Sequence, residues 1–150
     1  MFRYVHTNLI AKDADKLISF YKNILHCKSI NEQRDLSGEW LDRLTYVNQA
    51  HITGEHLLLP GYGADHPTLE IFSYNEVKNS VIAEINRPGL GHLAFEVDDV
   101  EETLAEILHA GGGCVGEVVT ADYPNNVEAV FVYARDPEGN IIELQSWRQK

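Results

Sequence analysis

Several features are scarce in this 150-residue sequence, and each absence narrows the class of protein. Only two cysteines occur, Cys27 and Cys114, and they form neither a C-x-x-C pair nor a zinc-knuckle spacing. We therefore expect reduced structural thiols rather than a disulfide or a reactive site. No apolar run approaches the roughly 18 residues that a membrane-spanning helix needs, and the amino terminus lacks the pattern of a secretory signal. These absences predict a cytoplasmic protein that does not enter membranes.

Positive charge is also scarce, because the sequence has 12 lysines and arginines but 23 aspartates and glutamates, which gives a formal net charge of -11. An acidic surface repels phosphate backbones and anionic lipids, so we expect no nucleic-acid partner and no binding to membrane surfaces. The hydrophobic content of 44% and charged content of 23% are typical of globular proteins. The length suits one compact domain or two small fused units.

The first half of the chain predicts one helix among four extended segments. Asp13 is placed to cap a helix whose apolar residues, from Leu17 to Leu25, recur with a spacing of about 3.6 residues. Residues 38–47 form an irregular or helical insertion. Strands are predicted at residues 4–10, 28–35, 50–59 and 68–74, so the first half has the order βαβββ.

The second half repeats this order after a polar connector and the breaker Arg87-Pro88-Gly89. Asp99 is placed to cap a helix over residues 100–110, and a tight turn at 136–140 precedes the last strand. Strands are predicted at residues 91–97, 114–119, 128–134 and 141–147. We predict an α+β fold with modules at 1–75 and 89–150 and a connector at 76–88. The two βαβββ modules form a cupped mixed β-sheet with helices packed on the outside.

Four residues recur at equivalent places in the two modules: His6, Glu70, His92 and Glu143. His6 precedes the capping Asp13 by seven residues and His92 precedes Asp99 by seven, while each glutamate lies in the last strand among aliphatic residues. A buried carboxylate is unfavourable unless another charge compensates it. A divalent cation would compensate both carboxylates, and two neutral imidazoles would complete an N2O2 ligand set.

Strand alternation places further residues beside this quartet. Asn8 shares a face with His6, and Trp147 shares a face with Glu143. We expect Asn8, Phe72 and Trp147 to contact a substrate. Five aromatic residues have faces suited to lining a pocket: Phe72, Tyr74, Phe131, Tyr133 and Trp147.

The other five histidines receive structural roles. His51 and His56 lie on one predicted strand but five positions apart, so at most one of them can face the cup. His26, His66 and His109 lie in predicted loops or at helix ends.

Three motifs carry a resemblance to a known family: residues 6–21 (HTNLIAKDADKLISFY), 91–100 (GHLAFEVDDV) and 136–144 (DPEGNIIEL). With them the chain resembles, over essentially its whole length, the vicinal oxygen chelate superfamily. That superfamily includes glyoxalase I, methylmalonyl-CoA epimerase, extradiol dioxygenases and the fosfomycin and bleomycin resistance proteins. The resemblance implies paired modules around a divalent metal, with His6, Glu70, His92 and Glu143 at the ligand positions.

Within the superfamily, the order His, Glu, His, Glu is most similar to bacterial glyoxalase I. The insertion that contains Trp40, Leu41, Asp42 and Arg43, followed by residues 56–60, departs from that pattern. These segments are similar to a branch that includes a cyclitol-ketone epimerase. The substrate class therefore stays open between these types.

The resemblance implies a metal-dependent isomerase or lyase. Two adjacent oxygens of a small-molecule substrate would chelate one divalent ion (Ni, Co, Zn, Mn or Fe), and Glu143 or Glu70 would remove a proton alpha to a carbonyl. We expect a homodimer, with each site formed either within one chain or between two copies. Two alternatives remain: an extradiol-type iron dioxygenase, which needs two histidines and one carboxylate, and a non-catalytic ligand- or drug-binding protein.

Overall fold

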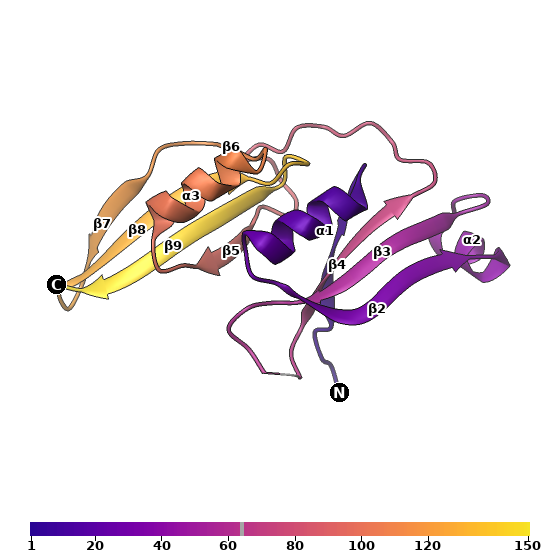
Figure 1. Cartoon of the computed structure of the whole chain (residues 1–150), viewed down its shortest axis with the longest axis horizontal. Coiled ribbons are helices and arrows are strands. Elements are labelled where there is room, and N and C mark those ends of the chain that lie inside the picture. Colours follow the sequence, from indigo (N-terminus) through magenta and orange to yellow (C-terminus); the bar gives the residue numbers. More distant parts are fainter. Residues whose placement is uncertain (64) are drawn as a thin grey trace. The chain divides into compact units, whose positions relative to one another are not determined.

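The computed structural model describes residues 1–63 and 65–150, which form two compact units, Met1–Ser80 and Val81–Lys150 (Figure 1). The boundary between the units lies in a stretch without helix or strand between Tyr74 and Leu93. The first unit contains β1 (His6–Ile10), α1 (Ala14–Asn23), β2 (Lys28–Ser37), α2 (Glu39–Thr45), β3 (His51–Leu58) and β4 (Thr68–Tyr74).

The sheet of the first unit has the strand order β1-β4-β3-β2. β1 pairs with β4 in parallel, whereas β3 pairs antiparallel with both β4 and β2. Helix α1 packs against β3 and β4, and the Ser73 hydroxyl accepts a hydrogen bond of 3.1 Å from the backbone N–H of Ala14. Leu69 and Ile71 share the face of Ser73 and are almost fully buried. Glu70 therefore lies on the opposite face of the sheet from the helix.

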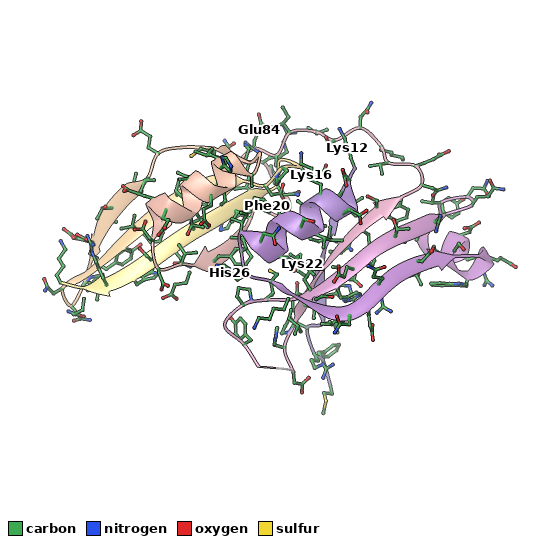
Figure 2. All side chains as sticks on the ribbon, in the orientation of Figure 1. Lys12, Lys16, Phe20, Lys22, His26 and Glu84 are labelled. Carbon is green, nitrogen blue, oxygen red and sulfur yellow. The ribbon has the colours of Figure 1, made fainter. Side chains whose placement is uncertain are left out.

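Two polar contacts fix α1 in place. The Asp13 side chain caps the helix by accepting a hydrogen bond of 3.0 Å from the Lys16 N–H, as predicted. Lys22, near the other end of α1 (Figure 2), pairs with the buried carboxylate of Glu55 on β3 at 2.8 Å. This ion pair joins the helix to the sheet and compensates a charge on its helical face.

Gly54 allows β3 and β4 to approach closely. It has a φ of +153°, and a Cβ atom at this position would lie 2.0 Å from the carbonyl oxygen of Ile71. A larger residue there would force the strands apart.

The predicted insertion forms helix α2, whose Leu41 packs in a buried cluster with Ala50, Ile52 and Phe72.

The second unit contains β5 (Leu93–Glu96), α3 (Val100–His109), β6 (Gly113–Cys114), β7 (Val119–Tyr123), β8 (Val127–Arg135) and β9 (Ile141–Gln149). Its sheet has the order β5-β9-β8-β6, and β7 also pairs with β8. The first and last strands are again parallel, and the other pairs are antiparallel. Helix α3 packs against β8 and β9 above the buried Ile142 and Leu144. The side chain of Asp99 caps α3 at 2.9 Å from the Glu102 N–H.

The predicted α+β class with mixed sheets is confirmed, and three details of the second half differ from prediction. The strand predicted at 114–119 is the two-residue β6 followed by an irregular segment, and β7 was not predicted at all. β7 has the alternating sequence VTADY, and most of its residues are exposed. β5 is shorter than predicted, and His92 immediately precedes it.

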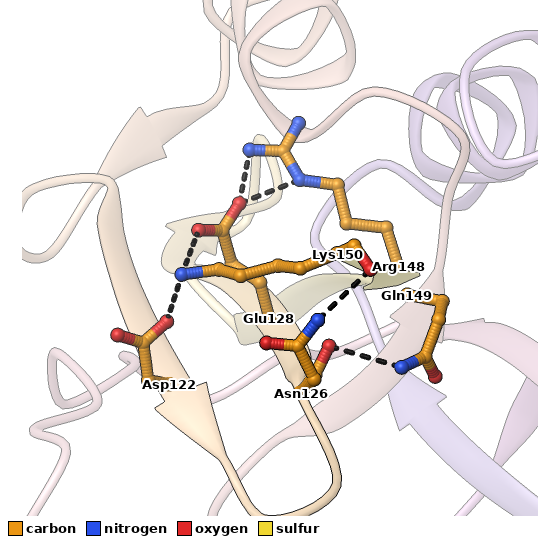
Figure 3. Close-up of polar contacts among 6 residues, drawn as sticks. All are labelled: Asp122, Asn126, Glu128, Arg148, Gln149 and Lys150. Carbon is orange, nitrogen blue, oxygen red and sulfur yellow. Dashed lines mark hydrogen bonds and ion pairs between the residues drawn. The ribbon is translucent and has the colours of Figure 1, made fainter.

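Charged side chains tie the carboxyl-terminal strand to its neighbours (Figure 3). Glu128 on β8 pairs with Arg148 on β9 and, at 3.1 Å, with Lys150. Lys150 also pairs with Asp122 on β7 at 2.5 Å. Most of these groups are solvent-exposed, so each contact adds little to stability, but together they fix the end of the sheet.

Neither cysteine forms a disulfide; Cys27 is buried and Cys114 is exposed. Across residues 1–63 and 65–150, no helix combines the length and the apolar character that crossing a bilayer requires.

Candidate metal centre

The parallel pairing of β1 with β4 brings a histidine and a glutamate together in the first unit. Glu70 on β4 lies opposite Asn8 on β1, and His6 is two residues earlier on the same face. The His6 Nε2 atom lies 2.9 Å from Glu70 Oε2. The His6 side chain is 37% exposed and that of Glu70 is 11% exposed, so the pair opens to solvent on the histidine side.

Glu70 is surrounded by nitrogen donors. Besides His6, the Asn8 amide donates a hydrogen bond of 3.3 Å to Oε2, and His56 Nε2 contacts Oε1. A carboxylate in this largely buried position is stabilised by such donors, which supply the hydrogen bonds that water would otherwise make.

His56 is the residue of this cluster that the sequence prediction missed. It lies on β3 directly opposite Glu70 and is buried, whereas His51 on the same strand pairs with the exposed Asp35. Burial lowers the pKa of His56, and the charge of Glu70 opposes that shift. His6, His56 and Glu70 each present a ligand atom within 4.8 Å of the others.

The second unit contains an equivalent pair. The His92 Nε2 atom lies 3.2 Å from Glu143 Oε2, with side-chain exposures of 32% and 16%. Glu143 on β9 lies opposite Ala94 on β5 and opposite Tyr133 on β8. A hydrogen bond to the Glu143 carboxylate and partial burial raise the pKa of Tyr133. The Tyr133 ring also packs against His92, with 5.1 Å between centroids.

The tight turn before β9 positions Glu143. Asp136 is buried, and its Oδ1 accepts hydrogen bonds from the Glu138 and Asn140 N–H groups at 3.0 and 2.9 Å. Its Oδ2 accepts a further bond of 2.8 Å from the Asn140 side chain. This motif is therefore a structural turn that fixes where β9 starts.

Both histidine and glutamate pairs have the chemistry and spacing of metal ligands. Two ligand atoms at right angles around an ion, each about 2.1 Å from it, lie about 3 Å apart. The separations of 2.9 and 3.2 Å agree with this value. Imidazole nitrogens and carboxylate oxygens together suit Zn, Ni, Co, Mn and Fe.

The three residues predicted to contact substrate occupy different environments. Asn8 donates to Glu70 and so belongs to the first pair. Phe72 is 9% exposed, packs in the cluster around Leu41 and lies 6.0 Å from the His56 ring centroid. Trp147 is 42% exposed and packs edge-on against Tyr123, while its Nε1 donates to Gln145 at 2.7 Å.

A sequence model of the Glyoxalase/Bleomycin resistance protein/Dioxygenase superfamily matches residues 3–144. Among curated proteins, a lactoylglutathione lyase of Neisseria meningitidis is 26% identical over 144 residues, which is 95% of this chain and 88% of that protein. A probable lactoylglutathione lyase of Vibrio parahaemolyticus is 27% identical over 143 residues, with the same two coverages.

Solved structures share the fold. A glyoxalase family protein from Bacillus cereus has a TM-score of 0.80 and 23% identity, covering 98% of this chain and 95% of its own. The trypanothione-dependent glyoxalase I of Leishmania major has a TM-score of 0.64 and 24% identity, covering 97% of this chain and 87% of its own.

Proposed function

Because the chain belongs to the Glyoxalase/Bleomycin resistance protein/Dioxygenase superfamily, we propose that it is a divalent-metal-dependent isomerase or lyase of glyoxalase I or epimerase type. The observation that carries this proposal is the repeated pairing of an imidazole with a carboxylate, His6 with Glu70 and His92 with Glu143. The similarity to two curated lactoylglutathione lyases supports a lyase.

The proposed ligand set is His6, Glu70, His92 and Glu143, two nitrogen and two oxygen donors for one divalent ion. Four protein ligands on a six-coordinate ion leave two positions, enough for two adjacent oxygens of a small-molecule substrate. When bound, the ion supplies Lewis-acid polarisation of a substrate oxygen. Both pairs fit this role in donor chemistry and in spacing.

We assign the proton transfer to a glutamate. Glu143 or Glu70 would take a proton from the carbon alpha to a carbonyl and return it, either to the same carbon or to its neighbour. Glu70 is contacted by three residues, His6, Asn8 and His56. Glu143 is contacted by His92 and Tyr133, and Ala94 lies where the first unit has an asparagine. Glu143 thus has one hydrogen-bonding neighbour fewer and is our first candidate for the base.

The proposed substrate contacts are Asn8, Phe72 and Trp147. Asn8 and Trp147 lie on the glutamate-bearing faces of their sheets, and the exposed indole of Trp147 offers an apolar surface to a ligand.

We also propose that the protein is a cytoplasmic homodimer. Light scattering coupled to size-exclusion chromatography would test the dimer.

Metal analysis combined with proton exchange tests the proposed function. Purified protein loaded with Ni, Co, Zn, Mn or Fe would be incubated in deuterated water with 2-hydroxy ketones, thiohemiacetals and 2-methylmalonyl thioesters. Metal-dependent exchange at the alpha carbon of one class is the expected result. A protein that binds none of these ions and exchanges no substrate would contradict the proposal and favour a ligand-binding role.

One observation favours a second candidate, an extradiol-type iron dioxygenase. His6, His56 and Glu70 alone form a set of two histidines and one carboxylate, which is the ligand type of non-haem iron oxygenases. An aerobic assay with ferrous iron and a panel of catechols separates the two candidates, because ring cleavage belongs only to the oxygenase.

A further inference from the structure

His56 and His6 contact different carboxylate oxygens of Glu70. His56 Nε2 contacts Oε1, whereas His6 Nε2 lies 2.9 Å from Oε2. The contact with His56 follows from strand register, since the two residues are directly opposite in the antiparallel β3–β4 pair. One carboxylate oxygen thus remains on the side of His6, and the other is turned toward β3.

The far side of the His56 ring is also constrained. Its Nδ1 lies 3.4 Å from the Thr68 hydroxyl, which is on β4 two residues before Glu70. If that hydroxyl donates to Nδ1, the single N–H of a neutral imidazole is on Nε2 and points at Glu70. The ring is only 11% exposed and packs edge-on against His6, with 5.7 Å between centroids.

The second unit places a different donor at the equivalent position. Tyr133 lies directly opposite Glu143 in the antiparallel β8–β9 pair, as His56 lies opposite Glu70. The phenol forms a hydrogen bond with the Glu143 carboxylate, and its ring contacts His92. Both glutamates thus have a proton donor on the neighbouring antiparallel strand.

We propose that His56 and Tyr133 are positioning residues of the metal centre. Each holds one oxygen of a ligand glutamate by a hydrogen bond, so that the other oxygen faces the histidine of its pair. This inference rests on the proposed function, because it assigns Glu70 and Glu143 as ligands. Hydrogen-bonding partners of metal ligands typically contribute a factor of about 10–100 in metal affinity.

The test measures Co(II) affinity of the whole protein by competition with a chelator. His56→Phe keeps a flat ring but removes the N–H, His56→Gln restores an N–H donor, and Tyr133→Phe removes only the hydroxyl. His51→Phe, on the same strand but paired with Asp35, and Tyr123→Phe, on β7, are the matched controls.

We expect His56→Phe and Tyr133→Phe each to weaken Co(II) binding by about 10–100-fold. His56→Gln should recover most of this loss, and the two controls should bind as the wild type does. X-ray absorption of the Co(II) protein should count the same number of imidazole ligands in the wild type and in His56→Gln, because His56 is not itself a ligand.

Two results would overturn the inference while leaving the proposed function intact. One is unchanged Co(II) affinity in folded Tyr133→Phe and His56→Phe, or in Tyr133→Phe alone if His56→Phe does not fold. The other is the loss of one imidazole from the ion's ligands in His56→Gln, which would make His56 a ligand. A wild-type protein that binds no Co(II) or other divalent ion would instead contradict the proposed function, and the inference with it.

Discussion

The Nε2 atom of His6 lies 2.9 Å from Oε2 of Glu70, and this contact is produced by the parallel pairing of the first and last strands of the unit. The second unit repeats the arrangement, since β5 pairs in parallel with β9 and brings His92 to Glu143. In each unit the helix that follows the first strand, α1 or α3, packs on the opposite face of the sheet. The same connection order thus places a histidine beside a glutamate twice, each time on the face away from that helix.

Replacing Glu143 by glutamine should slow proton exchange strongly. The substitution removes the proposed base while keeping a side-chain oxygen, so we expect turnover to fall by about 10²–10⁴-fold with some metal still bound. The rate is measured by deuterium incorporation into the substrate that the panel identifies. Glu117→Gln, at an exposed position of the same unit, is the control. Turnover equal to the wild type would remove Glu143 from the catalytic step.

The pKa of His56 predicts a dependence of stability on pH. Burial holds this pKa below its ordinary value of 6.5, so the unfolded chain takes up a proton at this residue before the folded protein does. The contribution to stability is complete above about pH 6.5 and is lost as the pH falls through the folded-state pKa. Urea midpoints with a chelator present, at about pH 7.5 and about pH 5, measure it. The wild type should lose more stability than His56→Gln over this range, and equal losses would refute the prediction.

Removing the partner of Glu55 should destabilise the first unit. Lys22→Met leaves the Glu55 carboxylate, which is 5% exposed, without its ion pair at 2.8 Å. An unsatisfied buried group of this kind costs about 1–3 kcal/mol, measured as a change in the free energy of unfolding by urea. Lys16→Met, an exposed lysine on the same helix (Figure 2), should change it by less than about 0.5 kcal/mol. Equal effects of the two substitutions would show that the ion pair contributes nothing.

The two cysteines should differ in reactivity. Burial raises the pKa of the Cys27 thiol to about 12, so it is protonated and shielded, whereas Cys114 is exposed. Ellman's reagent should therefore react quickly with one thiol in the native protein and with two after unfolding. Cys114→Ser should abolish the fast reaction. Rapid reaction of both thiols in the native wild type would contradict the assigned burial of Cys27.

Local signals in the sequence were sufficient to predict most of the helices and strands. Asp13 and Asp99 cap the two predicted helices, and the predicted strand at 68–74 coincides with β4. β7 was missed because its alternating run, VTADY, is only five residues long and is followed at once by the turn-forming sequence Pro124-Asn125-Asn126.

The donors opposite the glutamates depend on strand register, which is harder to read from sequence. The position of Tyr133 opposite Glu143 could have been predicted, because the tight turn at 136–140 fixes the pairing of β8 with β9 and the opposite residue can be counted from it. The position of His56 opposite Glu70 could not be predicted, because a long connection joins β3 to β4 and no turn type fixes their pairing. Alternation alone could not choose between His51 and His56.

The proposed metal centre is tested most simply by the metal content of the purified protein and of four single variants: His6→Ala, Glu70→Gln, His92→Ala and Glu143→Gln. After loading with zinc and desalting, elemental analysis should find one ion per wild-type chain and less in every variant. A wild-type chain that retains no divalent ion, or one whose zinc content is unchanged by both His92→Ala and Glu143→Gln, would contradict the proposed ligand set.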